Sequence, residues 1–518
     1  MANDVNIQDI IDATSAKERF NKLDSDRNSV LTRARSCSAL TIPSVLPADG
    51  HTETAELATP YQSLGARLVN NLSSKLLLSL LPPNTSFFRL IVSDDVKETL
   101  AQSPGQNNPD VGGALSEVEG KLVQIEQQIL KQIEREALRV PTFEAIKSLI
   151  ITGNSLCYKT EANLDTYKLN DYVIVRDFSG TPIEIITRAT AVKDSLPQTI
   201  IDALGEDIPE DSKINIYTRA VYKNEVWYEY QTVEELLVEG SEVEYSDPNK
   251  FPYIPLRWTA ISGENYGRGL VEQYLGDFRS LEGLYQLLIE SSAVQARTIF
   301  GKKPGSLIDI DELNSADNGA VVYGDLENDI STLRVDKGSD LQVPMNMIQD
   351  LTRRLEQAFL VASSVARQSE RTTATEIRYM ASDLEEALGG VYSVLSLEYQ
   401  RPLAYLLLAQ SKVNLKSLGL DAVIVTGVEA LGRNNELDKL RQFNSFLQEL
   451  GNPEMVLARL NIDNYISTIG ASLGLDVTNL IKSQGQIDQE QQAQAGQQLA
   501  MQGATNVVNG ATTAPQGQ

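Results

Sequence analysis

Three arginines, the residues best suited to binding an anion, lie between positions 367 and 378. This segment reads Arg-Gln-Ser-Glu-Arg-Thr-Thr-Ala-Thr-Glu-Ile-Arg. Guanidinium groups bind phosphates and carboxylates, and three arginines here reverse the local charge of a chain with 70 Asp and Glu against 45 Lys and Arg residues. Apolar spacing on both sides predicts long helices, the first over Met345–Val365. Thr373 and Glu376 have capping-box spacing and predict the start of the second helix. Spacing alone is typical of an exposed connection between helices.

Residues suited to catalysis are sparse. The chain contains no Gly-x-x-x-x-Gly-Lys-Ser/Thr sequence, and the glycines of 263–269 are more typical of a flexible lead into a helix than of a phosphate loop. His51 has no serine or cysteine partner in the sequence, and Cys157 lies in an apolar strand that predicts core packing. We therefore expect no catalytic residue, no metal site, no cofactor and no enzyme activity. A further group of carboxylates is expected on the solvated side of a helix: Asp383, Glu385 and Glu386.

Composition narrows the possible functions. A chain of 518 residues is expected to form two to four structural regions, and 42% apolar with 22% charged residues is typical of a globular protein. The net charge of −25 argues against a broad nucleic-acid-binding surface, because gripping phosphates requires many Lys and Arg side chains. Such acidity is common in soluble cytoplasmic proteins, and it also suits a protein that meets DNA without adhering to it.

The cysteines and the N-terminus indicate the compartment. Cys37 and Cys157 are the only cysteines, which fits a reducing environment without disulfides. The first residues have neither the basic nor the apolar segment of a secretory signal, and the longest apolar runs are too short to cross a bilayer. We expect a soluble protein made in a cytoplasm, with no membrane partner.

Periodicity predicts a mixed α+β fold that is predominantly helical. Amphipathic helices are expected over 7–36, 60–81 and 115–138, and short strands between 154 and 260. A long helix is expected over 267–300. The rods formed by this helix and by Met345–Val365 have apolar faces that a single chain does not obviously cover.

An acidic module, 302–343, separates these two rods. It contains nine Asp or Glu residues against four Lys or Arg residues. Its short apolar runs, 307–308, 320–323 and 330–335, are expected to form small strands.

The C-terminal part is expected to be mainly helical. The helix that begins near Thr373 should bend or lose a hydrogen bond at Gly389-Gly390 and at Arg401-Pro402. One strand is expected over 422–426, followed by helices over 429–450 and 453–473. The glutamine-rich segment 484–502 is either a helix supported by neighbours or a frayed tail.

Several segments together resemble the head–tail connectors, or portal proteins, of short-tailed podovirus bacteriophages. The most specific is Ser-Glu-Arg-Thr-Thr-Ala-Thr-Glu-Ile-Arg-Tyr from Ser369, followed by Leu-Glu-Glu-Ala-Leu-Gly-Gly-Val-Tyr-Ser from Leu384. The others are Thr-Ile-Pro-Ser-Val-Leu-Pro from Thr41, Thr-Pro-Tyr-Gln-Ser-Leu-Gly-Ala-Arg-Leu from Thr59, Gly-Glu-Asn-Tyr-Gly-Arg-Gly from Gly263, Tyr-Leu-Gly-Asp-Phe-Arg-Ser-Leu-Glu from Tyr274 and Thr-Gly-Val-Glu-Ala-Leu-Gly-Arg from Thr426.

The resemblance implies a subunit with a wing, a stem, a clip and a crown, which assembles into a ring of twelve at one capsid vertex. The genome passes through this ring during packaging and ejection, and a separate ATPase drives the packaging. The implied regions are 1–266 (wing), 267–300 (first stem helix), 301–343 (clip), 344–366 (second stem helix), 367–428 (tunnel loop and long wing helix), 429–505 (crown) and 506–518 (disordered tail).

Residue roles follow from the resemblance as expectations. The channel wall should be mainly acidic so that DNA slides, with a narrow positive constriction from Arg367 first, Arg371 second, and Arg378 if it is not a structural ion-pair residue. The acidic clip should dock the packaging motor and later the tail adaptor, through Asp309, Asp311, Glu312, Asp325, Glu327 and Asp336.

The partners implied by the resemblance are other copies of the chain, double-stranded DNA in transit, the large terminase ATPase, the major capsid and scaffolding proteins, the tail adaptor and the internal core proteins. The expected location is the unique vertex of the virion, after assembly in the host cytoplasm. A structural adaptor or scaffold protein of the virion without a DNA conduit is the alternative, because it would share the composition and the lack of catalytic residues.

Overall fold

A computed structural model describes residues 15–52, 54–83, 86–92, 111–196, 198–204, 212–296, 299–333, 341–361, 390–411 and 422–426, with a few single positions between them. These residues form helices and antiparallel sheets, which confirms the expected mixed class. The chain divides into two units: unit 1 contains Met1–Pro83 and Ile133–Gln410, and unit 2 contains Asn84–Gln132 and Ser411–Gln518. The helices and the tail expected after position 429 lie outside the described residues.

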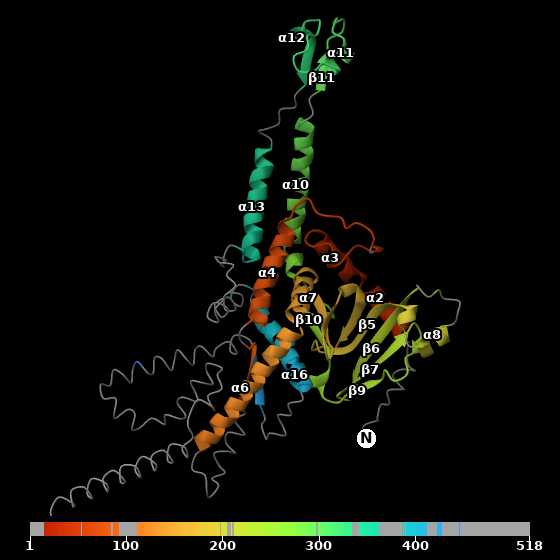
Figure 1. Ribbon diagram of the computed structural model, residues 1–518, viewed down its shortest axis with the longest axis vertical. Coiled ribbons are helices and arrows are strands. Elements are labelled where there is room, and N and C mark those ends of the chain that lie inside the picture. The colour runs from red at the N-terminus through yellow and green to blue at the C-terminus, as the bar shows by residue number, and fades with distance from the viewer. Residues whose placement is uncertain are drawn as a thin grey trace, which may run out of the picture. The chain divides into compact units, whose positions relative to one another are not determined.

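The larger sheet of unit 1 is an antiparallel meander (Figure 1). Asn224 and Glu225 both have positive φ, 51° and 66°, and form the two-residue turn between its central strands, a turn whose backbone twist matches that of the strands it joins. The alternating pattern between 154 and 260 predicted these strands, and this prediction is confirmed. In sheet order the strands are β4 (Tyr172–Arg176), β5 (Pro182–Val192), β6 (Lys213–Lys223), β7 (Val226–Val233) and β8 (Leu236–Leu237), with β9 (Val243–Tyr245) also paired to β7.

A smaller sheet has the order β10 (Tyr253–Arg257), β2 (Asn154–Lys159) and β3 (Leu164–Tyr167). Cys157 is fully buried in its central strand, so its predicted role in core packing is confirmed. Trp227 and Trp258, in the same β-rich region, are also buried. Short helical segments connect the strands: η1 (Leu169–Asp171), η2 (Lys193–Ser195), α8 (Gln198–Leu204) and η3 (Pro248–Lys250).

The N-terminal helices pack against these sheets, but the continuous helix predicted over 7–36 is wrong. The chain forms α2 (Ala16–Asp26) and α3 (Asn28–Ala39), which are separated at Arg27. The Arg27 guanidinium is buried, donates to the carbonyl oxygen of Tyr172 at 2.6 Å and binds the Asp24 carboxylate at 2.7 Å. This buried cation stabilises the break, because its donors are paired there with Asp24 of α2 and Tyr172 of β4.

Two further helices complete this part of unit 1, α4 (Leu64–Leu80) and α7 (Arg139–Thr152). The first was predicted to begin at Pro60 and begins four residues later, because Tyr61 and Gln62 donate their backbone N–H groups to the Glu282 carboxylate. The second ends at Gly153, which has a φ of 79° and packs against the backbone of Arg268 and Gly269.

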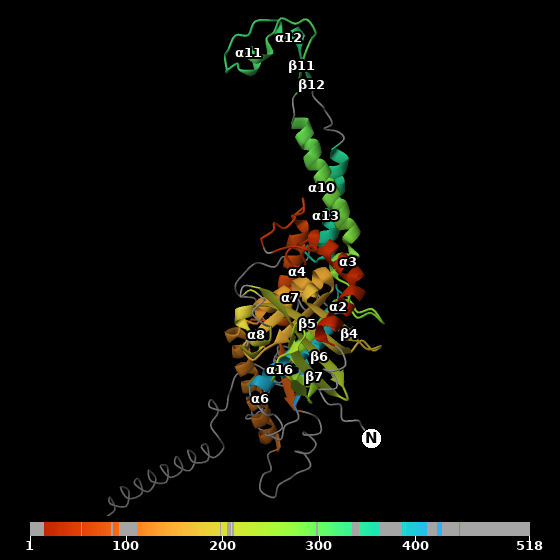
Figure 2. The same cartoon turned by 90° about the vertical axis from the view of Figure 1, so that its right-hand side faces the viewer.

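The two predicted rods exist with different ends. The first consists of α9 (Leu270–Gln273) and α10 (Leu275–Ala296), and the second is α13 (Gln342–Ala358). Figures 1 and 2 show α10 and α13 side by side. The prediction that the first rod reaches Phe300 is wrong, because that residue pairs in a strand. The second rod was predicted to reach Val365, but its helix stops at Ala358.

The acidic module between the rods contains one hairpin. Its strands are β11 (Ile299–Lys302) and β12 (Ile330–Leu333), in the antiparallel register Ile299↔Leu333. Two short helices, α11 (Ile310–Asn314) and α12 (Leu326–Asp329), lie between the strands in sequence. Of the predicted strands, only the last was correct, since 307–308 and 320–323 form no strand.

The segment 391–410 changes helix type along its length. It forms α15 (Val391–Leu395), a π-helical turn over Ser396–Gln400 (η4) and α16 (Arg401–Gln410). The disturbance predicted at Arg401-Pro402 is confirmed, because the π turn ends there. This segment is anchored to the end of α4: the Tyr392 hydroxyl donates to the Ser79 carbonyl at 3.0 Å and the Gln400 amide to the Leu80 carbonyl at 2.7 Å.

Unit 2 is described only in part. Its strands β1 (Phe88–Val92) and β13 (Ala422–Thr426) pair antiparallel, with Phe88 opposite Thr426, which confirms the strand predicted over 422–426. Most of helix α6 (Val111–Arg135) belongs to this unit. Within the unit, the buried Glu126 carboxylate of α6 accepts a hydrogen bond from the Leu90 backbone N–H at 2.8 Å.

Candidate functional site

The predicted arginine constriction cannot be described, because Arg367, Arg371 and Arg378 lie outside the described residues, as does Asp336. The chain leads toward the arginines as far as Val361, just after α13. The acidic module, which the structure describes as far as Leu333, is therefore the part of the predicted site whose geometry can be given.

Two of the predicted docking carboxylates cap short helices. Asp309 accepts from the Asp311 backbone N–H at 2.9 Å at the start of α11, and Asp325 accepts from the Asn328 backbone N–H at 3.2 Å in α12. The Asn328 side chain donates a second bond to Asp325 at 2.8 Å, and these hydrogen bonds lower the pKa of Asp325. Asp309 and Asp325 therefore cap helices within the module. Their residue type alone does not distinguish them in the sequence from the other acidic residues of the module.

The remaining predicted acids of the module point their charge into solvent. Asp311, Glu312 and Glu327 are exposed residues in the first turns of α11 and α12. Carboxylates in the first turn of a helix favour the positive end of its dipole, so these three stabilise the short helices while they remain accessible.

The module also exposes large apolar residues that the sequence analysis did not select. Leu307 is 79% exposed, Val321 is 93% exposed and Tyr323 is 78% exposed. The apolar runs around them were interpreted as strands, whose alternate residues would be buried. Only Ile308 is buried among these positions, against the backbone of Gly324, where no side chain would fit. Among its described residues the module has almost no core of its own.

The rods that carry this module are packed at one end and exposed at the other. Phe359 is fully buried and lies 5.9 Å from the Phe278 ring and 6.1 Å from the Tyr274 ring, measured between centroids. Leu281 and Leu355 are also fully buried in this part of unit 1. Toward the module the large apolar side chains lie in solvent: Leu287, Ile289 and Val294 of α10, and Val343, Met345 and Met347 of α13.

Two glycines of the segment 263–269, Gly267 and Gly269, have a packing role. The Asn154 side chain accepts from the Gly267 N–H at 2.7 Å and donates to its carbonyl at 3.1 Å. A Cβ on Gly269 would lie 2.7 Å from the Ile151 carbonyl oxygen. The end of α7 therefore fills the space beside Gly267 and Gly269. The segment leads into α9 at Gly269, as expected, but these two glycines are closely packed.

The single histidine borders a polar hollow of about 710 Å³ in unit 1. Arg35 pairs with Asp49 there and donates to the Asn170 side chain at 3.2 Å. Arg188 lies 3.7 Å from Asp171 on another part of the lining. Cations and carboxylates are mixed around His51, which does not give the nucleophile-and-base geometry of a hydrolase.

Metal and membrane binding were also considered for the described part of the chain. No group of three or more His, Cys, Asp or Glu side chains there could hold a metal ion. No described helix is both long and apolar enough to cross a membrane.

Comparison with known families identifies the class of protein. The model of a family described as bacteriophage head to tail connecting protein matches residues 13–481. Because this match covers most of the chain, the chain belongs to the family of bacteriophage head-to-tail connecting proteins. The resemblance read from its motifs is thereby confirmed.

Individual relatives are similar over nearly their whole length. The portal protein of Escherichia phage T7 is 35% identical over 525 residues, which cover 97% of this chain and 93% of the relative. The portal protein of Enterobacteria phage T3 is 35% identical over 510 residues, covering 95% and 92%. That of Enterobacteria phage SP6 is 30% identical over 504 residues, covering 95% of each chain. These names describe a portal protein and no enzyme activity.

Among solved structures, a chain from the neck of a native GTA particle computed with C12 symmetry is weakly similar. The TM-score is 0.33 and the sequence identity is 10%, over 78% of this chain and 89% of that chain.

Proposed function

We propose that this chain is the portal, or head–tail connector, that forms the DNA channel at one vertex of a phage capsid, for packaging and ejection of the genome. Family membership and the relatives named as portal proteins support this function. The wing, stem, clip and crown boundaries expected from the sequence belong to the same proposal.

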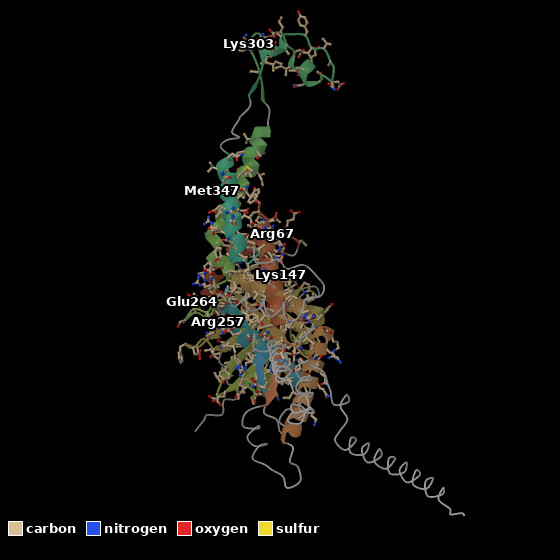
Figure 3. The ribbon with its side chains drawn as sticks, turned by 90° about the vertical axis from the view of Figure 1, so that its left-hand side faces the viewer. Arg67, Lys147, Arg257, Glu264, Lys303 and Met347 are labelled. Carbon is tan, nitrogen blue, oxygen red and sulfur yellow. The ribbon has the colours of Figure 1, made fainter. Side chains whose placement is uncertain are left out.

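The exposed ends of α10 and α13 carry the proposal of a ring. Met347 is 51% exposed and Val343 is 63% exposed, although both are large apolar side chains on a helix. Figure 3 shows Met347 on α13. Full burial of one such side chain stabilises a protein by about 1.5–3 kcal/mol. A neighbouring copy that covers this surface would gain that energy at several positions, and repetition of one such contact gives a ring when the rotation between copies closes.

Negative-stain imaging of the purified chain tests this function. We expect twelvefold rings with a central bore wide enough for a DNA duplex. Monomers or small oligomers would contradict the ring. Rings without such a bore would instead favour a structural adaptor or scaffold protein of the virion, the alternative class.

The acidic composition suits transport of DNA. A duplex carries about one negative charge per 1.7 Å of its axis, so a basic wall would hold it at many points, whereas an acidic wall leaves it free to slide. A short positive constriction, with Arg367 first and Arg371 second, would contact few phosphates at once and resist slippage.

Phage particles that carry Arg367→Ala test the constriction. We expect packaging to begin normally and the packaged DNA to be retained less well than in wild type. Arg135→Ala is the control, because the exposed Arg135 side chain lies outside the expected constriction. Normal packaging and retention in Arg367→Ala particles would contradict the role of this arginine.

The acidic module is proposed to dock the packaging motor, a terminase ATPase, and later the tail adaptor. The exposed carboxylates of Asp311, Glu312 and Glu327 provide the charge, while Asp309 and Asp325 also hold the helix starts. The double variant Asp311→Asn/Glu312→Gln should keep the ring and lower packaging. Glu18→Gln, an exposed change on α2, is the control. Unchanged packaging in the double variant would rule out a docking role for these two carboxylates.

A further inference from the structure

The end of α13 has an unusual residue at a position that favours glycine. Leu360 has a φ of 58°. Its backbone N–H donates to the Gln357 carbonyl at 3.1 Å, and the Val361 N–H donates to the Glu356 carbonyl at 2.8 Å. These two bonds define a Schellman motif, in which the left-handed position is usually glycine because a Cβ crowds the backbone there. Leucine at this position therefore needs support from elsewhere in the fold.

Two side chains of α4 give that support. The half-buried Lys75 ammonium donates a hydrogen bond to the Leu360 carbonyl oxygen. Eight residues earlier on the same helix, the Arg67 guanidinium lies 2.5 Å from the Glu356 carboxylate, and Figure 3 shows Arg67 on α4. A cation near the last carbonyl groups of a helix is favourable for the helix dipole. These contacts therefore hold both ends of the final turn of α13.

The local sequence favours a different ending. Residues 361–366 read Val-Ala-Ser-Ser-Val-Ala and contain no glycine or proline. Their spacing continues the apolar side of the helix, which is why the sequence predicts α13 to extend to Val365. Two arrangements therefore compete at this point: a longer helix, favoured by the local sequence, and the stop after Ala358, stabilised by a lysine 285 residues away.

We propose that Lys75 is a positioning residue: it ends α13 after Ala358 and thereby sets the direction in which the chain leaves toward Arg367 and Arg371. Each residue added to an α-helix turns the chain by about 100° and moves it by about 1.5 Å. An extension of only two residues would turn the point at which the chain leaves the helix by more than half a turn. This inference rests on the proposed function, in which those arginines contact DNA.

Hydrogen exchange on the assembled full-length protein tests the clamp directly. In Lys75→Met we expect the Leu360 and Val361 amides to exchange about tenfold faster than in wild type, because one charge-assisted hydrogen bond is lost. Lys22→Met, which changes an exposed lysine on α2, should exchange as wild type does at these amides. Unchanged exchange in Lys75→Met would overturn the proposal.

A second substitution separates the stop itself from general packing. Glycine adopts the left-handed conformation without strain, so the double variant Lys75→Met/Leu360→Gly should return the two amides to nearly wild-type exchange. The conservative variant Lys75→Arg keeps a donor and should also remain protected. Fast exchange in both of these variants would show that Lys75 supports packing in general, and the positioning role would be lost.

The functional measurement is the retention of DNA in phage particles. We expect Lys75→Met particles to release several-fold more DNA on heating than wild type, and the double variant to restore retention. Lys75→Met could raise amide exchange and still retain DNA normally, while Arg367→Ala particles leak. Lys75 would then end the helix without positioning the arginines. That result would overturn this inference but leave the proposed constriction standing. If Arg367→Ala particles also retain DNA normally, the proposed constriction fails as well.

Discussion

Two buried glutamates of the larger sheet show how burial and pairing decide the behaviour of a single residue. Glu184 lies between two guanidinium groups, 2.8 Å from that of Arg19 and 2.7 Å from that of Arg219. Glu229 is equally buried, but its hydrogen-bond partner among the described residues is the Tyr245 hydroxyl, which donates at 3.2 Å. Burial without a cation raises the pKa of Glu229 to about 7, since an apolar surrounding disfavours the charged form.

The raised pKa predicts a pH-dependent stability. An unfolded glutamate titrates near 4.5, so the folded state binds the proton more tightly and stability falls as the pH rises from about 4.5 to about 7. Glu229→Gln removes this loss, and above pH 7 the variant should be more stable by up to about 3 kcal/mol. Denaturant unfolding at pH 5 and pH 8 measures the difference, which should shrink to about 1 kcal/mol at the lower pH.

Glu184→Gln is the matched control in the same sheet. It leaves Arg19 and Arg219 without their shared carboxylate, and breaking a buried ion pair costs about 3–5 kcal/mol, so this variant should be less stable than wild type at pH 8. An equal effect of both substitutions at pH 8 would contradict the difference in their surroundings.

At the scale of helices and strands, local patterns predicted the elements but not all of their ends. The β-rich region was found because its strands alternate apolar and polar residues and are separated by turn residues. Phe300 was placed in a helix because the apolar spacing of α10 continues toward it, whereas pairing with Thr332 makes it a strand residue. Leu360 ends α13 through contacts with α4, and no window of neighbouring residues contains that information.

The candidate site was predictable to a similar extent. Its excess of acid is evident in the composition, but the cap bonds of Asp309 and Asp325 depend on the backbone around them. The exposure of Val321 and Tyr323 could not be read from the sequence, since an apolar run normally predicts burial. The arginines of 367–378 were found through a family motif.

Gly324 gives a test of how the acidic module is held together. It has a φ of 142°, and a Cβ there would overlap the Ile308 side chain. Gly324→Ala should therefore displace the buried Ile308 side chain and make 303–329 more sensitive to protease, with the rest of unit 1 intact. Gly319→Ala is the control, because Gly319 has a φ of 95° but open space around it. Equal sensitivity in both variants would assign the effect to backbone strain alone.

At the scale of the whole molecule, substitutions on the rods can distinguish the stability of the subunit from its assembly into a ring. Leu355 is fully buried between the rods, whereas Met347 is half exposed. Removing a buried leucine side chain costs about 2–5 kcal/mol, so Leu355→Ala should lower the unfolding midpoint of the subunit. Met347→Ser should leave that midpoint nearly unchanged and shift the ring toward smaller species.

Unfolding at subunit concentrations below assembly, together with sedimentation velocity at higher concentrations, distinguishes these two effects. Normal assembly of Met347→Ser would show that this side chain does not lie between copies. If Met347→Ser destabilises the subunit as much as Leu355→Ala does, the Met347 side chain contributes to packing within the subunit and not to assembly.

The anchoring of 391–410 on α4 has a consequence for synthesis on the ribosome. The carbonyl groups of Ser79 and Leu80 receive hydrogen bonds from residues made more than 300 positions later. At about 5–20 residues per second, the nascent chain needs roughly 15–60 s to supply them. Until then these two carbonyl groups at the end of α4 lack their later partners, so this part of unit 1 can be completed only after about four fifths of the chain has been made.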